Sequence, residues 1–565
     1  MFKIATPESV GISSRQIYKY INALNERVHM HSVLMAKGDK IIYEGYWKPF
    51  NKDFNHRMYS VTKSFVSVAI GLLVEDGKIS LDDKIISYFP DKISGDVGEF
   101  LKEQTIREML TMTTVGLHKE WYNEGAYDRT EFYMKNAWGK RPSGTAWEYD
   151  SAGSQVLCAL VERVSEKRLF DFLNERIFTH LGAFKNATIL KAPNGDSWGD
   201  SALICTPRDL LSFARFVMNY GTYNGKRLMN DEYLREATSY KVDNSTNCHY
   251  TSKSLGYGYQ FWRTVGNAFA FVGMGDQMAI CFPNEDFIFV CTADNQGNDC
   301  SRDYIITQLY ESIIKEISHT PLEENAEMQE KLAGLTRGLE LFCVKRLKDS
   351  PIRALVHNQL YLLDENPMKI KQLVISIKND GSGMILYNKN GKQIMLPFLI
   401  NKNHFGKFPE LGYSNEYGGV RTSDGFKYDC ATSATWTQEN RLVIFSQVID
   451  KYLGNLTMTL TFKGDLLYLT CEKYAEDFMW EYAGEAVGHR YVIKPEYERE
   501  GFESQEDYDK YLKNKGRIEK MLEESLASTE RVLGYGSIRE NRKRQLLLEE
   551  LGIAWKRSKE RSLGD

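Results

Sequence analysis

The sequence predicts a mixed α/β fold for residues 1–320 and a separate β-rich domain after residue 336. Two hairpin signals lie near the ends of the first zone, and amphipathic helices occupy the region between them. Beyond residue 336 the pattern changes to short β-rich runs separated by turn residues. A chain of 565 residues has room for more than one domain, since domains usually hold roughly 100–200 residues.

Apolar runs on either side of short polar turns predict the two hairpins. The first joins Ser32–Ala36 to Lys40–Tyr46 across a Lys-Gly-Asp turn. The second joins Gln277–Phe282 to Phe287–Thr292 across a turn of Pro, Asn, Glu and Asp. Polar turns of this kind between two strand-like runs are typical of antiparallel pairs.

Helical spacing of apolar residues predicts the helices between the hairpins. One helix begins near Ser60, and others cover residues 152–164 and 207–219. The apolar stripe of the first helix has the spacing of a buried face, and it consists of Val61, Phe65, Val68, Ala69 and Leu72. A charged segment at about residues 321–335 is predicted to be a linker or a short helix.

The β-rich zone covers residues 336–490. Its strand-like runs are Gln372–Ile377, Met384–Asn388, Arg441–Val448, Leu456–Phe462 and Leu466–Glu472. Several short strands at this spacing predict an antiparallel sandwich or barrel. The remaining residues, 491–565, are dominated by Glu, Lys and Arg and predict a charged helical or partly disordered tail.

Composition narrows the classes of function. The net charge of -4 gives no basic surface for nucleic acid. No apolar stretch reaches the roughly 18 residues that cross a bilayer, and the N-terminus has no signal-peptide pattern. The nine cysteines contain no CxxC pair, and no cluster has metal-ligand spacing, so no metal site is predicted. These features together favour a cytoplasmic protein that binds neither nucleic acid nor membrane.

The most informative motif is Ser60-Val61-Thr62-Lys63, at the start of the first predicted helix. Residues three apart lie on one helical face, so the lysine amine can take the proton of the serine hydroxyl. A serine needs such a neighbouring base to become a nucleophile. A second copy, Ser312-Ile313-Ile314-Lys315, lies in a predicted surface helix and is read as structural. The first copy therefore predicts a serine acyl hydrolase.

Four further segments follow the motif in order. They are Gly77–Lys84, Thr105–Thr113, Pro142–Gly153 with its Tyr-Asp-Ser sequence, and Phe271–Gln277 on a predicted strand. In this order and spacing the chain resembles the serine hydrolases of the class C β-lactamase and penicillin-binding-protein superfamily, and especially its esterase and amidase members. The resemblance covers about residues 1–320. It implies an antiparallel sheet flanked by helices, a helical subdomain around residues 85–190, and an active-site cleft between them.

The resemblance also implies roles for individual residues. Ser60 would be the nucleophile, Lys63 its partner on the helix, and Tyr149 the phenol that shares the proton, with Ser151 two residues further on. Burial of Lys63 would lower its affinity for a proton and suit it to act as a base. The helix start would favour negative charge at Ser60.

The third motif would supply the other side of the site. Gly273 would let the strand backbone approach the substrate, because glycine has no side chain. The N–H groups of Ser60 and Met274 would form the oxyanion hole.

Two residues depart from the family pattern. Phe271 stands where the family usually carries Lys or His, a cation that holds the carboxylate of penicillin-type substrates. An aromatic residue there favours a neutral or apolar ester or amide, and we expect Phe271 to contact it. Asp276 stands where many relatives have Gly, which leaves the shape of the following turn open.

Other candidate residues are weaker. Tyr413-Ser414-Asn415 and Tyr250-Thr251-Ser252 fit the tyrosine motif but lack its order or its preceding loop, and both are read as structural. An aromatic-rich segment lines a substrate pocket or packs a helical subdomain, and the sequence leaves both open; it follows His118 and contains Trp121, Tyr122, Tyr127, Tyr133 and Trp138.

The sequence therefore predicts hydrolysis of a small ester or amide through an acyl-enzyme on Ser60, with no cofactor. One alternative is D-amino-acid peptidase or β-lactamase activity with the same nucleophile. The other is a catalytically weak protein that uses its cleft for binding or scaffolding. The β-rich zone resembles the accessory C-terminal domains of some relatives, which would pack against or cover the cleft.

Overall fold

The computed structural model describes two compact units. Unit 1 comprises Met1–Phe342, Tyr413–Phe426 and Lys451–Leu453, and unit 2 comprises Cys343–Gly412, Lys427–Asp450 and Gly454–Asp565. The described residues are 2–93, 95–117, 126–137, 139, 141–246, 255–414, 416–418, 426–475, 482–491, 513, 516–517, 520–521 and 524. Most of the predicted tail lies outside the described residues, as do His118, Trp121, Tyr122, Trp138 and Tyr250.

A largely antiparallel sheet forms the centre of unit 1. Its strands, in spatial order, are β1 (Lys3–Ile4), β3 (Lys40–Tyr46), β2 (Met30–Lys37), β12 (Phe287–Ala293), β11 (Gln277–Phe282), β10 (Ala268–Gly273) and β9 (Trp262–Thr264). Both predicted hairpins are present, as β2–β3 and β11–β12. The pairing of β2 with β12, in which Leu34 faces Val290, joins the two hairpins into one sheet.

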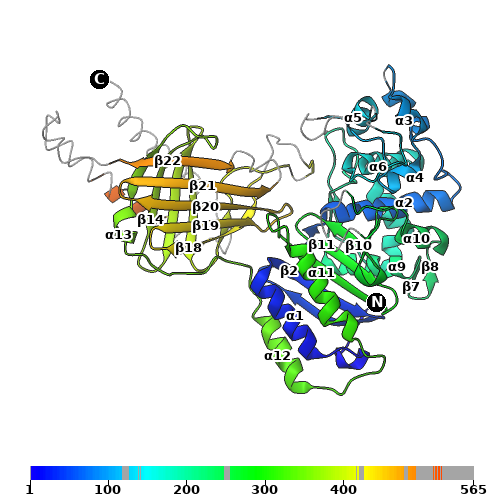
Figure 1. Ribbon diagram of the computed structural model, residues 1–565, viewed down its shortest axis with the longest axis horizontal. Coiled ribbons are helices and arrows are strands. Elements are labelled where there is room, and N and C mark those ends of the chain that lie inside the picture. The colour runs from blue at the N-terminus through cyan, green and yellow to red at the C-terminus, as the bar shows by residue number, and fades with distance from the viewer. Residues whose placement is uncertain are drawn as a thin grey trace. The chain divides into compact units, whose positions relative to one another are not determined.

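Three helices cover one face of this sheet, as Figure 1 shows. They are α1 (Ser14–Arg27), α11 (Ser301–Ser312) and α12 (Ala326–Arg337). Apolar residues of α1 and α11, such as Ile21 and Leu309, join strand residues such as Val33 and Ile280 in one buried core. The predicted linker is in part the helix α12, because its Met328 and Leu332 side chains are buried.

The other face of the sheet carries a cluster of phenylalanine rings. The ring of Phe213, from α9 (Pro207–Met218), stacks on Phe65 of α2 (Thr62–Glu75) with centroids 3.8 Å apart. The same ring meets Phe271 of β10 edge-on. Burial of several aromatic rings holds α2 firmly against the sheet, since each ring removes a large apolar surface from water.

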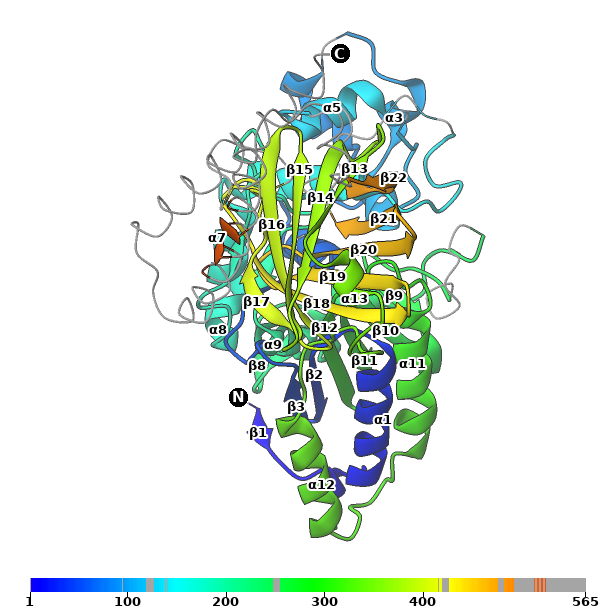
Figure 2. The same cartoon turned by 90° about the vertical axis from the view of Figure 1, so that its left-hand side faces the viewer.

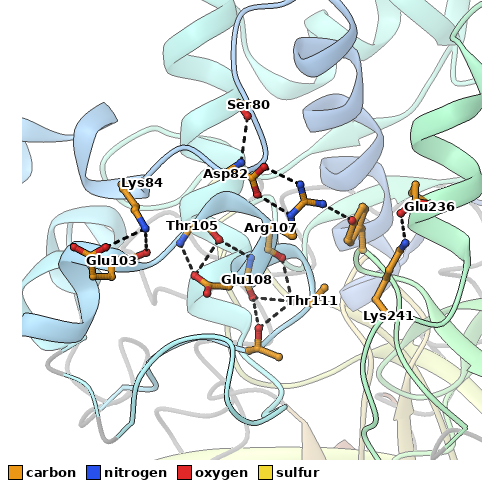
Figure 3. Close-up of polar contacts among 12 residues, drawn as sticks. Ser80, Asp82, Lys84, Glu103, Thr105, Arg107, Glu108, Thr111, Glu236 and Lys241 are labelled. Carbon is orange, nitrogen blue, oxygen red and sulfur yellow. Dashed lines mark hydrogen bonds and ion pairs between the residues drawn. The ribbon is translucent and has the colours of Figure 1, made fainter.

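A group of helices, most of them short, forms a subdomain next to α2. They are α3 (Glu99–Glu103), α4 (Ile106–Leu110), α5 (Arg129–Asn136), α6 (Ser151–Ser165), α7 (Leu169–Leu173) and α8 (Thr179–Leu181). Figure 3 shows how α4 is held. Thr105 and Glu108 form a capping box at its start, and Arg107 pairs with Asp82 and donates to the Tyr259 hydroxyl at 2.8 Å.

The remaining elements of unit 1 are small. A three-stranded sheet consists of β4 (His56–Arg57), β6 (Leu203–Cys205) and β5 (Thr188–Ile189). A two-stranded sheet of β7 (Thr222–Tyr223) and β8 (Lys226–Arg227) precedes α10 (Asp231–Thr238). In the part of the chain that the structure describes, no helix combines the length and the apolar character that crossing a bilayer requires.

Unit 2 is a β-barrel, one of the two predicted architectures. Its strands, in spatial order, are β16 (Lys392–Ile400), β15 (Ser382–Lys389), β14 (Ile370–Ile377), β13 (Gln359–Leu363), β22 (Gly484–Arg490), β21 (Leu466–Ala475), β20 (Gly454–Lys463), β19 (Arg441–Val448), β18 (Asp429–Gln438) and β17 (His404–Lys407). A parallel pairing of β16 with β18 closes the barrel. Figure 2 shows β14, β15 and β16 running across the direction of β19, β20 and β21. The aromatic rings of Tyr361, Trp436 and Phe462 pack within it.

Candidate active site

The predicted nucleophile lies on a tight turn between β4 and α2. A short 3-10 helix, η2 (Tyr59–Val61), carries Ser60 and leads directly into α2. Tyr59 has a φ of 47°, a left-handed conformation that is rare for a bulky residue. Two hydrogen bonds hold the turn: Thr62 Oγ1 donates to Tyr59 O at 2.6 Å, and Met58 N donates to Leu203 O at 2.8 Å. The turn leaves Ser60 half-buried.

Lys63 reaches the nucleophile from the first turn of α2. Its Nζ donates to Ser60 Oγ at 3.0 Å and to the main-chain oxygen of Asp200 at 2.7 Å. The Asp200 carboxylate also lies 3.7 Å from the amine. The side chain of Lys63 is 2% exposed, so its charge is enclosed together with its partners. The structure thus places the predicted nucleophile and its predicted base in direct contact.

Tyr149 approaches the same amine through its ring. Lys63 Nζ lies over this ring, 5.1 Å from the centroid, a cation–π contact. The ring also stacks on Trp262, with centroids 5.7 Å apart, and remains 38% exposed. Among the described residues, the hydrogen bonds of Lys63 go to Ser60 and Asp200, and none joins the Tyr149 hydroxyl to Ser60 or Lys63. The three predicted catalytic residues therefore lie in one cluster, with the phenol beside the amine.

The end of β10 lies against the turn at Met58–Ser60, which carries the predicted nucleophile and is called here the nucleophile turn. A Cβ atom on Gly273 would lie 2.3 Å from Met58 O and 3.3 Å from Ser60 N. Only glycine permits this approach, because the nearest atoms belong to the backbone and cannot rotate away. Met274, the next residue, is 39% exposed. The structure thus brings Gly273 against the nucleophile turn, while the oxyanion hole of the Ser60 and Met274 amides stays a prediction.

An ion pair fixes the turn that follows Gly273. Asp276 has a φ of 72° and pairs with Arg302 Nε at 2.8 Å. Its other carboxylate oxygen accepts a hydrogen bond from Ser301 Oγ at 2.5 Å. Arg302 also donates to Gly273 O at 3.1 Å. The departure at position 276 is therefore matched by an arginine of α11, which no local sequence pattern connects with it.

Phe271 lies in the aromatic core and does not form an exposed wall of the site. Its ring is fully buried and meets Phe261 at 5.1 Å and Phe213 at 6.1 Å between centroids. This placement corrects the expectation that the ring offers a surface to the substrate, because other aromatic rings crowd around it. Position 271 therefore carries no positive charge, unlike the Lys or His that the family usually has there.

The segment after Tyr149 starts α6. Ser151 is its first residue and is half-buried. Asp150 caps the helix by accepting from Gly153 N at 2.8 Å, and it also accepts from Thr114 Oγ1 at 2.8 Å. Burial raises the pKa of the Asp150 carboxyl, although these hydrogen bonds and the charge of Lys63 oppose the shift. Asp150 therefore acts here as a buried cap that holds Tyr149 and Ser151 in place.

Gln260 joins the helices that carry the motifs. It is buried with a φ of 64°, and its main-chain oxygen accepts from Ser64 Oγ of α2 at 2.7 Å. Its side-chain oxygen accepts from Ser154 Oγ of α6 at 2.9 Å, and its N–H donates to Leu110 O of α4 at 3.0 Å. These bonds fix the distance between Lys63 and Tyr149, which lie on different elements.

Sequence reasoning missed Asp200 and Gln260. Both lie in loops outside the motifs, and their roles arise from contacts between residues far apart in the chain. Tyr413, which also fits the tyrosine motif, is buried and packs against Tyr452 with the ring centroids 4.9 Å apart. In the aromatic-rich segment, Tyr133 is buried against Gln104 and Tyr127 is exposed. The described residues of the segment thus include one packed ring and one exposed ring.

Comparison with known proteins agrees with this arrangement. The Beta-lactamase family profile matches residues 19–309, more than half of the chain. A curated relative, the 6-aminohexanoate-dimer hydrolase of Paenarthrobacter ureafaciens, is 24% identical over 219 residues, which are 36% of this chain and 55% of the relative. The chain thus spans about half the length of that relative.

Two solved structures are also similar to this chain. A family VIII carboxylesterase has 15% identity and a TM-score of 0.44, covering 55% of this chain and 99% of the carboxylesterase. An octameric penicillin-binding protein homologue from Pyrococcus abyssi has 14% identity and a TM-score of 0.43, covering 84% of this chain and 99% of the homologue. Because the family profile matches residues 19–309, more than half of the chain, the chain belongs to the Beta-lactamase family.

Proposed function

We propose that the protein is a serine hydrolase that cleaves a neutral or apolar ester or amide through an acyl-enzyme on Ser60. The observation that carries the proposal is the 3.0 Å hydrogen bond between Lys63 Nζ and Ser60 Oγ in an enclosed position. A serine hydroxyl gains nucleophilicity when a base within hydrogen-bonding reach accepts its proton.

The proposed reaction has two acyl-transfer steps. Ser60 Oγ attacks the substrate carbonyl while its proton passes to Lys63, and the carbonyl oxygen becomes an oxyanion. The oxyanion would accept hydrogen bonds from the Ser60 and Met274 amides, and loss of one such donor typically costs about 3 kcal/mol. The proton then passes through Tyr149 to the leaving alkoxide or amine, and the bond to the leaving group breaks.

Water completes the cycle. A water molecule attacks the acyl carbon of the ester on Ser60, and the Lys63–Tyr149 pair takes its proton. The second tetrahedral intermediate collapses, the bond to Ser60 Oγ breaks, and the serine regains a proton. The products are a carboxylic acid and an alcohol or amine, and the residues return to their starting state.

The substrate class follows from what surrounds the nucleophile. The position that supplies a cation in relatives acting on penicillin-type substrates holds the buried Phe271. Among the described residues, the large apolar side chains that remain accessible beside the cluster include Tyr149 and Met274. Such a surface suits an acyl group without a carboxylate. The names of the relatives include both an amide hydrolase and a carboxylesterase, so both bond types belong to the proposal.

Labelling with a fluorophosphonate probe tests the nucleophile. We expect the wild-type protein to react with the probe and Ser60→Ala to lose the reaction completely. Ser312→Ala is the matched control, because Ser312 belongs to the second Ser-x-x-Lys sequence and donates instead to Gln308 O within α11. Labelling that persists in Ser60→Ala, or a folded wild type that does not react, would contradict the proposal. The second result would favour a binding protein.

A substrate panel tests the proposed class. We expect hydrolysis of p-nitrophenyl acetate and butyrate to exceed that of nitrocefin and of a D-alanyl peptide by at least about 100-fold in kcat/KM, since a missing charge partner typically costs about 3 kcal/mol. A preference for nitrocefin or the peptide would instead support the β-lactamase or D-amino-acid peptidase alternative.

A further inference from the structure

Two short segments from the second half of the chain belong to unit 1. They lie within Tyr413–Phe426, which joins β17 to β18, and Lys451–Leu453, which joins β19 to β20. Main-chain hydrogen bonds fasten the first segment: Lys191 N donates to Glu416 O at 2.8 Å, and Gly418 N donates to Lys191 O at 3.0 Å. Unit 1 therefore includes segments that come after α12, the last of its helices, in the sequence.

The second segment contacts the residue before the nucleophile. The N–H of Leu453 donates to the Tyr59 hydroxyl oxygen at 2.9 Å. Leu453 is fully buried and Tyr59 is 2% exposed, so this hydrogen bond is shielded from water. A buried donor that loses its acceptor pays the full penalty of desolvation, which makes such a bond a firm constraint.

Tyr59 needs such a constraint because of its backbone. Its left-handed φ of 47° is a conformation that a bulky residue holds only when its surroundings fix it. The turn at Tyr59 sets the direction of the next peptide unit. It thereby sets the direction of the Ser60 N–H, which is a predicted oxyanion donor, and the direction of Ser60 Oγ.

Arg57 holds the ring of Tyr59 from its face. The guanidinium carbon lies 4.3 Å from the centroid of the Tyr59 ring and 4.9 Å from that of Tyr452, which precedes Leu453. Arg57 is fully buried, and it also lies 4.5 Å from the ring of Trp198. Cation–π contacts gain strength when they are desolvated. The ring of Tyr59 is thus fixed on its face by Arg57 and at its hydroxyl by Leu453.

We propose that Tyr59 is a positioning residue, and that segment 451–453 holds the nucleophile turn in its reactive geometry through it. The inference rests on the proposed role of Ser60. It assigns to a loop of the second half of the chain a direct part in the reactivity of the first. A shift of the turn by a fraction of an ångström would misalign Ser60 with Lys63 and with the oxyanion hole, and misplacement of this order lowers rates strongly.

Tyr59→Phe tests the proposal, with Tyr20→Phe as its matched control. Tyr20 is also 2% exposed, and its hydroxyl donates to the main-chain oxygen of Ile305 at 3.1 Å, away from the site. Both variants lose one buried bond to a distant segment, so both should lower the melting temperature. Only Tyr59→Phe should lower kcat, by about ten-fold or more with KM little changed. If the two variants keep the same kcat as the wild type, Tyr59 is structural and the proposal is wrong.

Two substitutions at Leu453 test the other partner. Leu453→Pro removes the N–H donor, whereas Leu453→Ala removes the side chain and keeps the donor. We expect the kcat of Leu453→Pro to fall as in Tyr59→Phe, and the double variant to fall no further, because both remove the same bond. Equal kcat for the proline and alanine variants would contradict the proposal. A melting curve checks folding, and Tyr59→Phe remains decisive if the proline variant does not fold.

Ser60→Ala separates this inference from the function on which it rests. If Ser60→Ala is inactive and Tyr59→Phe is fully active, the hydrolase proposal stands and the positioning role fails. If Ser60→Ala keeps the activity of the wild type, the hydrolase proposal itself fails.

Discussion

Lys63 is the residue on which the proposed chemistry depends most. Its amine contacts the Ser60 hydroxyl, the main-chain oxygen of Asp200 and the Asp200 carboxylate from an enclosed position. The amine also lies over the Tyr149 ring, 5.1 Å from its centroid. Because the amine contacts the proposed nucleophile directly, a change of the amine should affect the reaction strongly.

Lys63→Met removes the amine and keeps most of the side-chain volume. We expect kcat to fall by about 100-fold or more, since positioned acid–base groups contribute about 10²–10⁴-fold. The release of p-nitrophenol from p-nitrophenyl butyrate measures this loss. Lys315→Met, in the second Ser-x-x-Lys sequence, is the control, because the side chain of that lysine is exposed and pairs with Glu311 at the surface. A fall in kcat of less than about ten-fold for Lys63→Met would argue against the base role.

Gly273→Ala adds one carbon atom where the strand meets the nucleophile turn. The new Cβ would lie 2.3 Å from Met58 O, so the strand or the turn must move. We expect a loss of about 1–3 kcal/mol of stability and a clear loss of kcat. Gly334→Ala is the matched control, since the nearest atom to its Cβ would be 3.9 Å away in a helix, and it should stabilise slightly. Denaturant unfolding and steady-state kinetics compare the two, and equal behaviour would contradict the close approach.

At the scale of elements, the site depends on two turns that face each other. One is η2 with its left-handed Tyr59, and the other follows β10 and is fixed by the pair of Asp276 and Arg302. The second turn matters for the site because Arg302 also donates to Gly273 O. The ion pair therefore links α11, on one face of the sheet, to the glycine beside the nucleophile.

Asp276→Asn tests this link. Asparagine tolerates the left-handed φ of 72° but carries no charge, so the ion pair with Arg302 is lost and the acceptor of the Ser301 hydroxyl is changed. We expect about 3 kcal/mol of destabilisation, because the largely buried Arg302 is left without its carboxylate partner. Asp39→Asn, which breaks an exposed pair with Lys3, should cost less than about 1 kcal/mol. Unfolding in urea measures both, and equal losses would show that the Asp276 pair has no special weight.

Local pattern predicted the elements that carry the site. The helix expected from Ser60 is η2 followed by α2, and the helix expected at 152–164 is α6 (Ser151–Ser165). Periodicity succeeds here because both helices bury an apolar face. It gave no sign of the turn at Gln260, because that residue is defined by bonds to three separate elements. The expected contact of Phe271 with the substrate came from the family resemblance and not from periodicity, and an apolar residue on a strand fits the core as well as a pocket.

At the scale of the whole molecule, each compact unit consists of several stretches of the chain that are separate in the sequence. The sequence predicted a change of domain between residues 320 and 336, whereas α12 packs into unit 1 and two later segments join it as well. Composition correctly predicted that the chain changes from mixed helices and strands to strands alone in its β-rich zone. It does not reveal that a loop between two barrel strands packs elsewhere, because such a loop has the same polar residues as any other.

Buried histidines give unit 1 a dependence on pH. Burial lowers the pKa of His29 and of His56 to about 4 from an ordinary 6.5. Burial, together with the neighbouring His56 ring, whose Nε2 lies 2.8 Å from His31 Nδ1, lowers the pKa of His31 well below its ordinary value. Between pH 6.5 and 4 the unfolded chain holds more protons than the folded one, so the free energy of unfolding falls as the pH is lowered.

We expect His29 and His56 each to contribute about 2 kcal/mol to this fall between pH 7 and pH 5. Denaturant unfolding at a series of pH values measures it. His56→Gln should reduce the slope, whereas His319→Gln should leave it unchanged, because His319 is exposed. An identical slope in wild type and His56→Gln would contradict the burial of an uncharged histidine.

Mass spectrometry of the acyl-enzyme is the most direct measurement of the central claim. The protein would be mixed with p-nitrophenyl butyrate, quenched in acid and digested. The account predicts a butyryl group on the peptide that contains Ser60, and none on that peptide in Ser60→Ala. Hydrolysis that continues in Ser60→Ala, or a butyryl group carried by a different residue during turnover, would contradict it.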